Sequence, residues 1–173
     1  METIEVDRCR FERVNLSETR LRHGMFSNAL FQWSDLANVN AADSSLLNTH
    51  VTGSRLTGLS WTNGLLREVL FEDCRMNLAG FRFTRFKTVV VFRNCELGRV
   101  NFQNADLSGA RSERCDLTAA QFSNARMTGA RFEECTLSDV SGVTAFAGAI
   151  VKSGDALGLA HTLASALGIT IEE

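Results

Sequence analysis

The sequence of 173 residues has no proline and no tyrosine, and it lacks a strong net charge and long apolar runs. Without proline, its turns cannot be set by a pyrrolidine ring and need another backbone device. The formal net charge of -2 favours neither nucleic acid nor an anionic membrane as a partner. No segment approaches the roughly 18 apolar residues of a membrane-spanning helix, and "METIEVDRCR" is charged where a signal peptide is apolar. We therefore expect one cytoplasmic domain that contacts neither membrane nor nucleic acid directly.

Large apolar side chains recur every five residues, a period that neither a helix nor a strand has. The stretch "NADLSGARSERCDLTAAQFSNARMTGARFEECTL" shows the pattern, and we call these places the central positions. From Leu137 backwards they are occupied by Phe132, Met127, Phe122, Leu117, Ser112, Leu107, Phe102, Leu97 and Phe92. One inserted residue within "KTVVV" shifts the register, and the series then runs from Phe86 back to Val6 with Ala41 as its small member.

Two residues before each central position stands a small side chain, which we call position -2. Leu59 is the one large residue at this position, so the second pattern supports the register independently of the first. One large and one small inward residue per pentad define a repeat whose units bury their faces only against neighbouring units. The sequence therefore predicts a solenoid.

Four pentads form one turn, because that spacing sorts the central residues by type. One such column reads Leu16, Leu36, Leu56, Met76, Leu97, Leu117 and Leu137. Four of the five cysteines also recur at intervals of 20 or 21 residues, at position -2 of the same column. A turn of about 20 residues with four sides, stacked at roughly 4.8 Å, gives a rod about 30 Å long with a Phe and Leu core.

The units "CDLTA", "ADLSG", "ARMTG" and "ARFEE" resemble the A(D/N)LXX units of the pentapeptide-repeat family, and the resemblance extends over about residues 4–140. It implies an all-β solenoid, a right-handed quadrilateral β-helix with a β-turn at each corner. We expect this β-helix over residues 1–140 and a cap with a helix, a possible dimerisation module, over residues 141–173. Ser112, Ala41 and Leu59 depart from the pattern, and the extra residue near Val89 should form a bulge.

The segment "SGDALGLAHTLASALGITI" predicts a helix that caps the end of the solenoid. Ser153 or Asp155 can cap its first turn, Gly168 suits a left-handed end, and Ile169 to Ile171 follow as a short strand. Its apolar stripe is wide enough for the rod and a second copy. This ending resembles bacterial pentapeptide-repeat proteins that protect DNA gyrase from quinolones, in which a C-terminal helix or module pairs two rods. The resemblance implies a homodimer through Leu157, Leu159, Leu163 and Leu167.

The cysteines and histidines give no catalytic, cofactor or metal site. All five cysteines occupy position -2, where a small apolar side chain is wanted, so we interpret them as core filler. Thiols 20 residues apart on one face lack the ligand spacing of a zinc site, and their parallel directions oppose disulfides. His23, His50 and His161 are not near one another in the repeat. We expect no enzyme activity and no cofactor.

Outward positions around one series of central residues carry carboxylates that could imitate the phosphates of DNA. This acidic ladder consists of Glu12, Glu72, Asp73, Glu113, Glu133 and Glu134. By resemblance, the partner would be DNA gyrase or topoisomerase IV, protected from poisons such as quinolones. Arginines stand on the same face, however, and residues 1–140 hold 17 acidic and 17 basic side chains. A salt-bridged, neutral surface is therefore the alternative interpretation.

A second hypothesis rests on apolar side chains at outward positions. They are Leu30, Trp33, Leu47, Leu65, Leu70, Leu78 and Phe83. Several lie on neighbouring coils of adjoining faces, where they could dock another protein. The protein would then be a scaffold or regulator with no link to gyrase.

Overall fold

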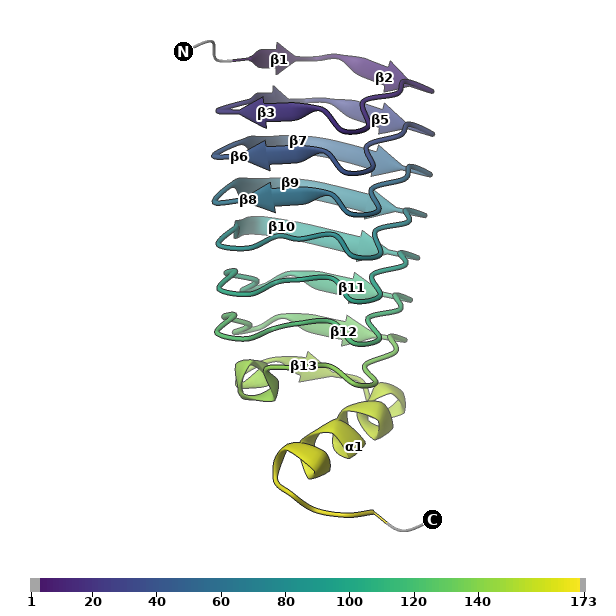
Figure 1. Ribbon diagram of the computed structural model, residues 1–173, viewed down its shortest axis with the longest axis vertical. Coiled ribbons are helices and arrows are strands. Elements are labelled where there is room, and N and C mark those ends of the chain that lie inside the picture. The colour runs from purple at the N-terminus through teal and green to yellow at the C-terminus, as the bar shows by residue number, and fades with distance from the viewer. Residues whose placement is uncertain (1–3, 172–173) are drawn as a thin grey trace.

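The computed structural model, which describes residues 4–171, is a solenoid of about 7 turns with a single C-terminal helix. Its coils stack along one axis, with the first coil at one end and the helix at the other (Figure 1). The pentad repeat produces this shape because each unit forms one side of a coil. The predicted fold class is confirmed.

Short parallel strands form parts of three of the four sides. They are β1 (Glu5–Asp7), β2 (Arg10–Glu12), β3 (Arg20–Arg22), β4 (Met25–Ser27), β5 (Leu30–Gln32), β6 (Asn40–Ala42), β7 (Ser45–Thr52), β8 (Ser60–Thr62), β9 (Leu65–Glu72), β10 (Arg85–Arg93), β11 (Arg111–Glu113), β12 (Arg131–Glu133) and β13 (Ile150–Val151). The larger sheet has the order β1-β4-β7-β9-β10-β11-β12-β13, with β2 and β5 pairing beside it, and β3-β6-β8 form a smaller sheet. All pairs are parallel, as coils that wind in one direction require.

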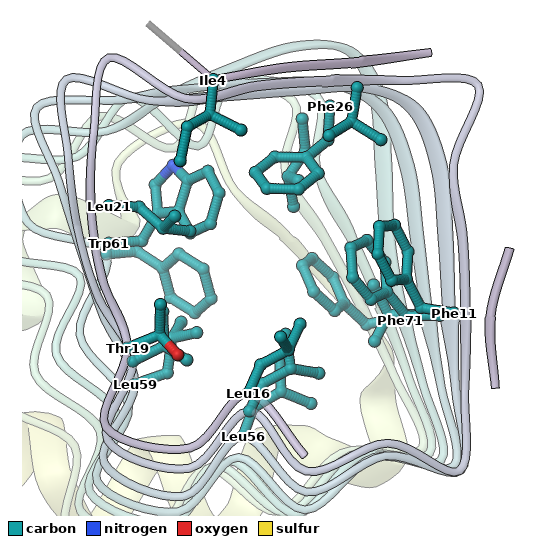
Figure 2. Close-up of a pocket in the computed structure, with 17 residues that line it drawn as sticks. Ile4, Phe11, Leu16, Thr19, Leu21, Phe26, Leu56, Leu59, Trp61 and Phe71 are labelled. Carbon is teal, nitrogen blue, oxygen red and sulfur yellow. The ribbon is translucent and has the colours of Figure 1, made fainter. Parts of the chain in front are cut away.

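We number the four faces by their first central residues: face 1 from Val6, face 2 from Phe11, face 3 from Leu16 and face 4 from Leu21. β7, β9 and β10 run along face 1, turn the corner and continue along face 2. Face 3 is joined by isolated bridges, and face 4 changes from strands to bridges after β8. The coil outline is four-sided, as expected from the column pattern (Figure 2).

Left-handed backbone conformations turn the corners in place of proline. The residue two positions after each central residue has a positive φ, from Arg8 at 54° to Asp139 at 57°. Asn and Asp, which tolerate this conformation, fill several of these positions, and Gly53, Gly58, Gly109 and Gly129 fill others. This conformation is the backbone device that the absence of proline required.

The inserted residue lies in β10, where the pairing with β9 shifts register between Lys87 and Val90. Val89 bulges outwards and is exposed, while Phe86 and Phe92 on either side of the bulge keep their places in the core. The predicted bulge is confirmed. It allows the pentad pattern to resume one residue later with the same inward side chains.

Stacked phenylalanine rings fill the centre of the later coils. Phe81, Phe102 and Phe122 stack at centroid distances of 5.6 and 5.5 Å along face 4. Phe92 of face 2 meets Phe102 edge to face at 6.0 Å, so rings from neighbouring faces interlock. The core prediction for these residues is confirmed, since both Phe102 and Phe122 are buried.

The C-terminal segment covers the last coil. A short turn of 3-10 helix (Val143–Phe146) places Phe146 against Phe122 and Phe132, with ring-centroid distances of 5.2 and 5.5 Å. A second 3-10 turn (Ser153–Asp155) leads into α1 (Ala156–Ala166), from which Leu159 is buried against the core. The predicted capping role of this segment agrees with these contacts.

Two details of this segment differ from the prediction. Asp155 stands at the N-cap but makes no side-chain hydrogen bond to the helix, because its own backbone is helical and the 3-10 turn already occupies that position. Ile169 to Ile171 form no strand, and the Ile169 N–H closes the end of α1 instead. The left-handed end is confirmed: Gly168 has φ 72°, and the Ile169 N–H donates to the Ala164 carbonyl at 2.8 Å.

Candidate functional site: the outer surface of face 2

The outer surface of face 2 combines the two sequence-predicted contact features. One outward column precedes the central residues and begins with Arg10, Leu30, His50, Leu70 and Val91, followed by Arg111, Arg131 and Ile150. The other follows the central residues and contains Glu12, Gln32, Thr52, Glu72, Arg93, Glu113 and Glu133. The parallel register holds each column straight along the rod, so these side chains form one continuous strip.

The acidic ladder is assembled in space, but most of its carboxylates are paired with bases. Arg93 lies between two of them, with Nη1 3.3 Å from Glu72 Oε1 and Nε 2.9 Å from Glu113 Oε2. Lys152 contacts Glu133, and Arg10 Nη2 lies 3.2 Å from Glu12 Oε2. Four of the six carboxylates therefore have a basic partner, which is the salt-bridged surface that the sequence left open as an alternative.

The ion pair with Lys152 also affects the pKa of Glu133. The hydrogen bond from the Lys152 ammonium lowers the pKa of Glu133, which keeps this side chain ionised well into acid. Asp73 accepts a hydrogen bond from Asn94 Nδ2 at 3.1 Å instead of an ion pair. Glu134 has no ion-pair partner within residues 4–171. Asp73 and Glu134 are therefore the carboxylates of the ladder whose charge is least compensated.

The apolar part of the strip lies on the earlier coils. Leu30, Leu70 and Val91 are half-buried on β5, β9 and β10, and their outer edges face solvent. Leu47 and Leu65 on face 1 are half-buried in the same way. The apolar positions that the sequence singled out do lie outside the core, and those on β5, β7 and β9 form neighbouring rows.

Trp33 stands at the corner beside this apolar part. Its side chain is exposed, with 52% of its surface accessible. The Arg13 guanidinium lies 5.4 Å from its ring centroid. A Cβ added to Gly53 would lie 2.7 Å from Trp33 Cδ1, so the indole rests on the Gly53 backbone. The sequence predicts that Trp33 is exposed. Its contacts with Arg13 in the preceding coil and Gly53 in the following coil are seen only in the structure.

The remaining exposed apolar residues lie elsewhere. Leu78 stands at the corner between faces 3 and 4, and Phe83 at the corner between faces 4 and 1 with Arg82 over its ring at 5.9 Å. They are therefore separate from the strip on face 2. They serve below as matched positions for control variants.

The buried thiols form a ladder inside face 3 that has no opening to substrate. Each donates to the carbonyl two residues earlier and to one in the preceding coil, as Cys74 does to Glu72 and Val51 at 3.2 and 3.3 Å. For Cys95 and Cys115 the hydrogen bond with the next thiol lowers the pKa, but the bond with the preceding thiol and burial outweigh it and raise the pKa to about 12. Protonated, buried thiols of this kind are structural.

No cluster within residues 4–171 has the three or more His, Cys, Asp or Glu side chains that would hold a metal ion. None of the helices in the same range has the length and hydrophobicity needed to cross a bilayer. The outer strip of face 2 offers apolar and charged contacts for a partner.

The residues predicted for a dimer interface lie on α1 or just after it, and they face different ways. Leu157 and Leu167 are 70% and 76% exposed, and Leu163 is 38% exposed. Leu159 points to the rod and is 9% exposed, so it belongs to the cap of the single chain. An apolar surface made by the other three remains available on the helix.

The repeat pattern is also recognised by comparison with known families. The family model of pentapeptide repeats matches residues 95–133 with 8 copies. The matched residues, which are less than half of the chain, therefore carry the pentapeptide-repeat pattern. Outside the matched residues the same pentad register continues through the paired strands from β1 to β10, so the solenoid is one uninterrupted stack.

Three solved pentapeptide-repeat structures resemble this solenoid weakly. Full-length QnrB1, a plasmid-mediated fluoroquinolone resistance protein, has 15% identity and a TM-score of 0.37, with 97% of this chain and 100% of that chain covered. HetL, involved in heterocyst differentiation regulation in Nostoc sp. strain PCC 7120, has 14% identity and a TM-score of 0.33, with 85% and 84% covered. Rfr23 from Cyanothece 51142 has 14% identity and a TM-score of 0.33, with 86% and 88% covered. No curated protein matches the sequence.

Proposed function

We propose that this solenoid is a non-enzymatic rod that binds a protein partner through the outer strip of face 2. One observation carries the proposal: half-buried leucines and a supported, exposed tryptophan adjoin a column of salt-bridged charges on the same surface. Tryptophan and arginine are the residues that most often dominate protein interfaces. The paired charges would fix the register of a partner, since a charge pattern contributes more to specificity than to affinity.

The strip is better suited to a protein than to nucleic acid. Binding to DNA or RNA draws its affinity from the release of counterions by an excess of basic side chains. The two columns of the strip hold four arginines and four glutamates, so they offer no basic excess. A protein partner, in contrast, can match both the apolar rows and the mixed charges.

An affinity-capture experiment with paired variants tests this role. Wild-type protein should retain a specific partner from a lysate, and Leu30→Glu with Leu70→Glu, both on face 2, should lose it because a charge is buried in the contact. Leu78→Glu changes the same residue type at a distant corner and should retain the partner. The proposal is wrong if the partner is retained equally by all three proteins, as long as circular dichroism shows that each is folded.

A narrower candidate is a DNA mimic that binds DNA gyrase or topoisomerase IV and protects it from poisons such as quinolones. What favours it is the column of Glu72, Glu113 and Glu133, with Asp73 and Glu134 at the adjoining corner free of ion pairs among the described residues. The resemblance of the repeats and of the C-terminal helix to gyrase-protecting proteins supports the same role, which requires the cytoplasm. The bases beside the column weigh against a continuous phosphate-like strip.

A supercoiling assay separates this candidate from the broader proposal. If the mimic is real, the wild-type protein at micromolar concentration should inhibit gyrase or protect it from a fluoroquinolone. Glu113→Lys with Glu133→Lys should abolish the effect, whereas Glu96→Lys on face 3 should preserve it. No effect of the wild type removes the gyrase role and leaves the affinity-capture test of face 2 intact.

We further propose that two rods pair through the exposed side of α1, with Leu157, Leu163 and Leu167 at the contact. Leu159, which was predicted in the same interface, would act indirectly by holding α1 against the last coil. Sedimentation should show a dimer at tens of micromolar, and Leu157→Glu with Leu167→Glu should make it monomeric. A monomeric wild type at that concentration would exclude this pairing.

A further inference from the structure

The solenoid encloses an apolar cavity of about 300 Å³ at its N-terminal end. Side chains from the first four coils surround it on all four faces (Figure 2). Ile4, Leu16 and Leu21 lie at its mouth and are only partly buried, whereas Phe71 and Phe81 close its floor. Three coil spacings of about 4.8 Å make this space roughly 14 Å deep.

Val51 lines the cavity at a position where the column of face 2 lacks a ring. Phe11 and Phe31 stack at a centroid distance of 4.6 Å, and Phe71 and Phe92 stack at 5.1 Å. Between Phe31 and Phe71 the central residue is Val51, which lacks a ring to reach the axis. Ser112 interrupts the same column beside a space of only about 10 Å³, so the larger void also depends on the other wall residues of the first four coils. The backbone pairing continues past Val51.

The lining of the cavity favours a hydrocarbon ligand. Of the lining side chains only Thr19 and Trp61 carry a polar atom, and Trp61 Nε1 already donates to the Ser44 carbonyl at 3.2 Å. A peptide inserted here would bury backbone N–H and C=O groups without partners, which is costly. An apolar molecule has no such groups, and a dry cavity of about 150 Å³ is enough to bind benzene.

The volume corresponds to about ten groups of the size of a water molecule or methylene. Since the cavity is also deep, an extended molecule fits it best. Thr19 belongs to the first coil, and its hydroxyl is drawn towards the cavity near the mouth (Figure 2). A chain that enters from the mouth would leave a polar end group there, beside this hydroxyl and the solvent. The rest of the chain would contact only the apolar wall.

We propose that the N-terminal cavity binds the single alkyl chain of a free amphiphile such as a medium-length fatty acid. The chain lies along the solenoid axis and the polar head stays at the mouth. This inference is independent of the proposed role of face 2, since the cavity lies inside the coils.

The two tryptophans allow a direct binding experiment. Trp61 lines the cavity and Trp33 stands outside, so Trp33→Phe leaves a single fluorophore at the site. Titration of this protein with decanoate should give a saturable change in Trp61 fluorescence with one chain bound per protein. Val51→Phe in the same background should weaken binding at least about tenfold, because its ring completes the column and occupies the space. Ser112→Ala, a change of another small central residue beside a space of only about 10 Å³, should leave binding unchanged.

A second variant guards against misfolding of the first. Leu16→Phe lies in the partly exposed first coil, where the backbone is least constrained by neighbours, and it should also weaken decanoate binding. Absence of a saturable response in the parent protein, or equal binding by both filled variants when they are folded, would overturn the proposal. Cosedimentation with phosphatidylcholine vesicles would overturn the assignment to a free chain. A dimer that Leu16→Phe dissociates, without decanoate binding, would show a second copy at the mouth and also overturn it.

Discussion

The two halves of this solenoid share one backbone and differ in how their centres are filled. The earlier coils enclose about 300 Å³, whereas the space beside Ser112 in the later coils is about 10 Å³. In the later half, rings from three faces interlock, as Phe81 does with Phe86 and Phe92 at 5.9 and 6.1 Å. In the earlier half, Val51 separates two pairs of stacked rings.

This difference shows that coil geometry does not depend on a filled axis. Around the cavity the ladder continues without interruption, since His50 N donates to the Ala29 carbonyl at 3.0 Å and Ser60 N to the Val39 carbonyl at 2.8 Å. The backbone bonds and the left-handed corners set the coil, and the central residues decide how tightly it is packed. A void can therefore persist where a function uses it.

The largest expected effect is the loss of a ring from the filled half. Phe102→Ala should cost about 3–5 kcal/mol in the free energy of unfolding, because stacked neighbours on both sides cannot collapse into the space. Phe11→Ala in the first coil, where the ring is half-buried, should cost only about 1–2 kcal/mol. Denaturant unfolding measures both, and a cost below about 1 kcal/mol for Phe102→Ala would contradict its place in the core.

Alkaline pH should destabilise the thiol ladder of the later coils. On unfolding, the pKa of Cys95 and of Cys115 falls from about 12 to the ordinary value of 9.0. Between these values the unfolded chain has lost protons that the folded chain keeps, so stability is full below pH 9.0 and falls as pH rises towards about 12. Near pH 10 the loss should be about 2–3 kcal/mol relative to neutral pH.

Unfolding curves of two variants give the control for this pH dependence. Cys95→Ala with Cys115→Ala should reduce the decline with pH. The hydrogen bond with Cys115 and burial both raise the pKa of Cys135, and burial still raises it in the double variant. Cys9→Ala removes an exposed thiol from the open end and should leave the decline as it is. An unchanged slope in the double variant would mean that other groups, such as the paired lysines and arginines, dominate the alkaline transition.

Most of the fold could be predicted from the sequence because a pentad constrains every position of a unit. The central and -2 residues predicted the core, the four-sided coil and the bulge at Val89. The cap at Asp155 failed because the segment before α1 forms a 3-10 turn, which leaves the Asp155 backbone helical. The strand at Ile169 to Ile171 failed, and the Ile169 N–H instead donates to the Ala164 carbonyl at the end of α1.

The candidate site was less predictable, because outward residues are not constrained by packing. The sequence placed carboxylates and arginines on one face, but only the register shows that Arg93 lies between Glu72 and Glu113. Similarly, Val51 counts as apolar and ordinary in the pattern, although it lines the cavity. Periodicity describes which way a side chain points, and it does not give the volume that remains unfilled.

Filling the cavity should remove the difference between the halves. Val51→Phe adds a ring between Phe31 and Phe71, and it should stabilise the protein by about 1 kcal/mol because apolar contacts replace empty space. The midpoint of thermal or denaturant unfolding measures this gain. A destabilised variant would show that the column has no room for a ring and that the void lies closer to the opposite faces.

The smallest expected effect concerns the bulge between the two halves. Thr88 has φ 58° and is exposed, and a β-branched residue is strained in this left-handed conformation. Thr88→Asn should therefore stabilise the protein by about 0.5–1 kcal/mol, since asparagine tolerates the conformation. The reverse change at a regular corner of the later half, Asn124→Thr with φ 59°, should destabilise by a similar amount. If Thr88→Asn instead lowers the unfolding midpoint, the threonine side chain itself stabilises the bulge between the two halves.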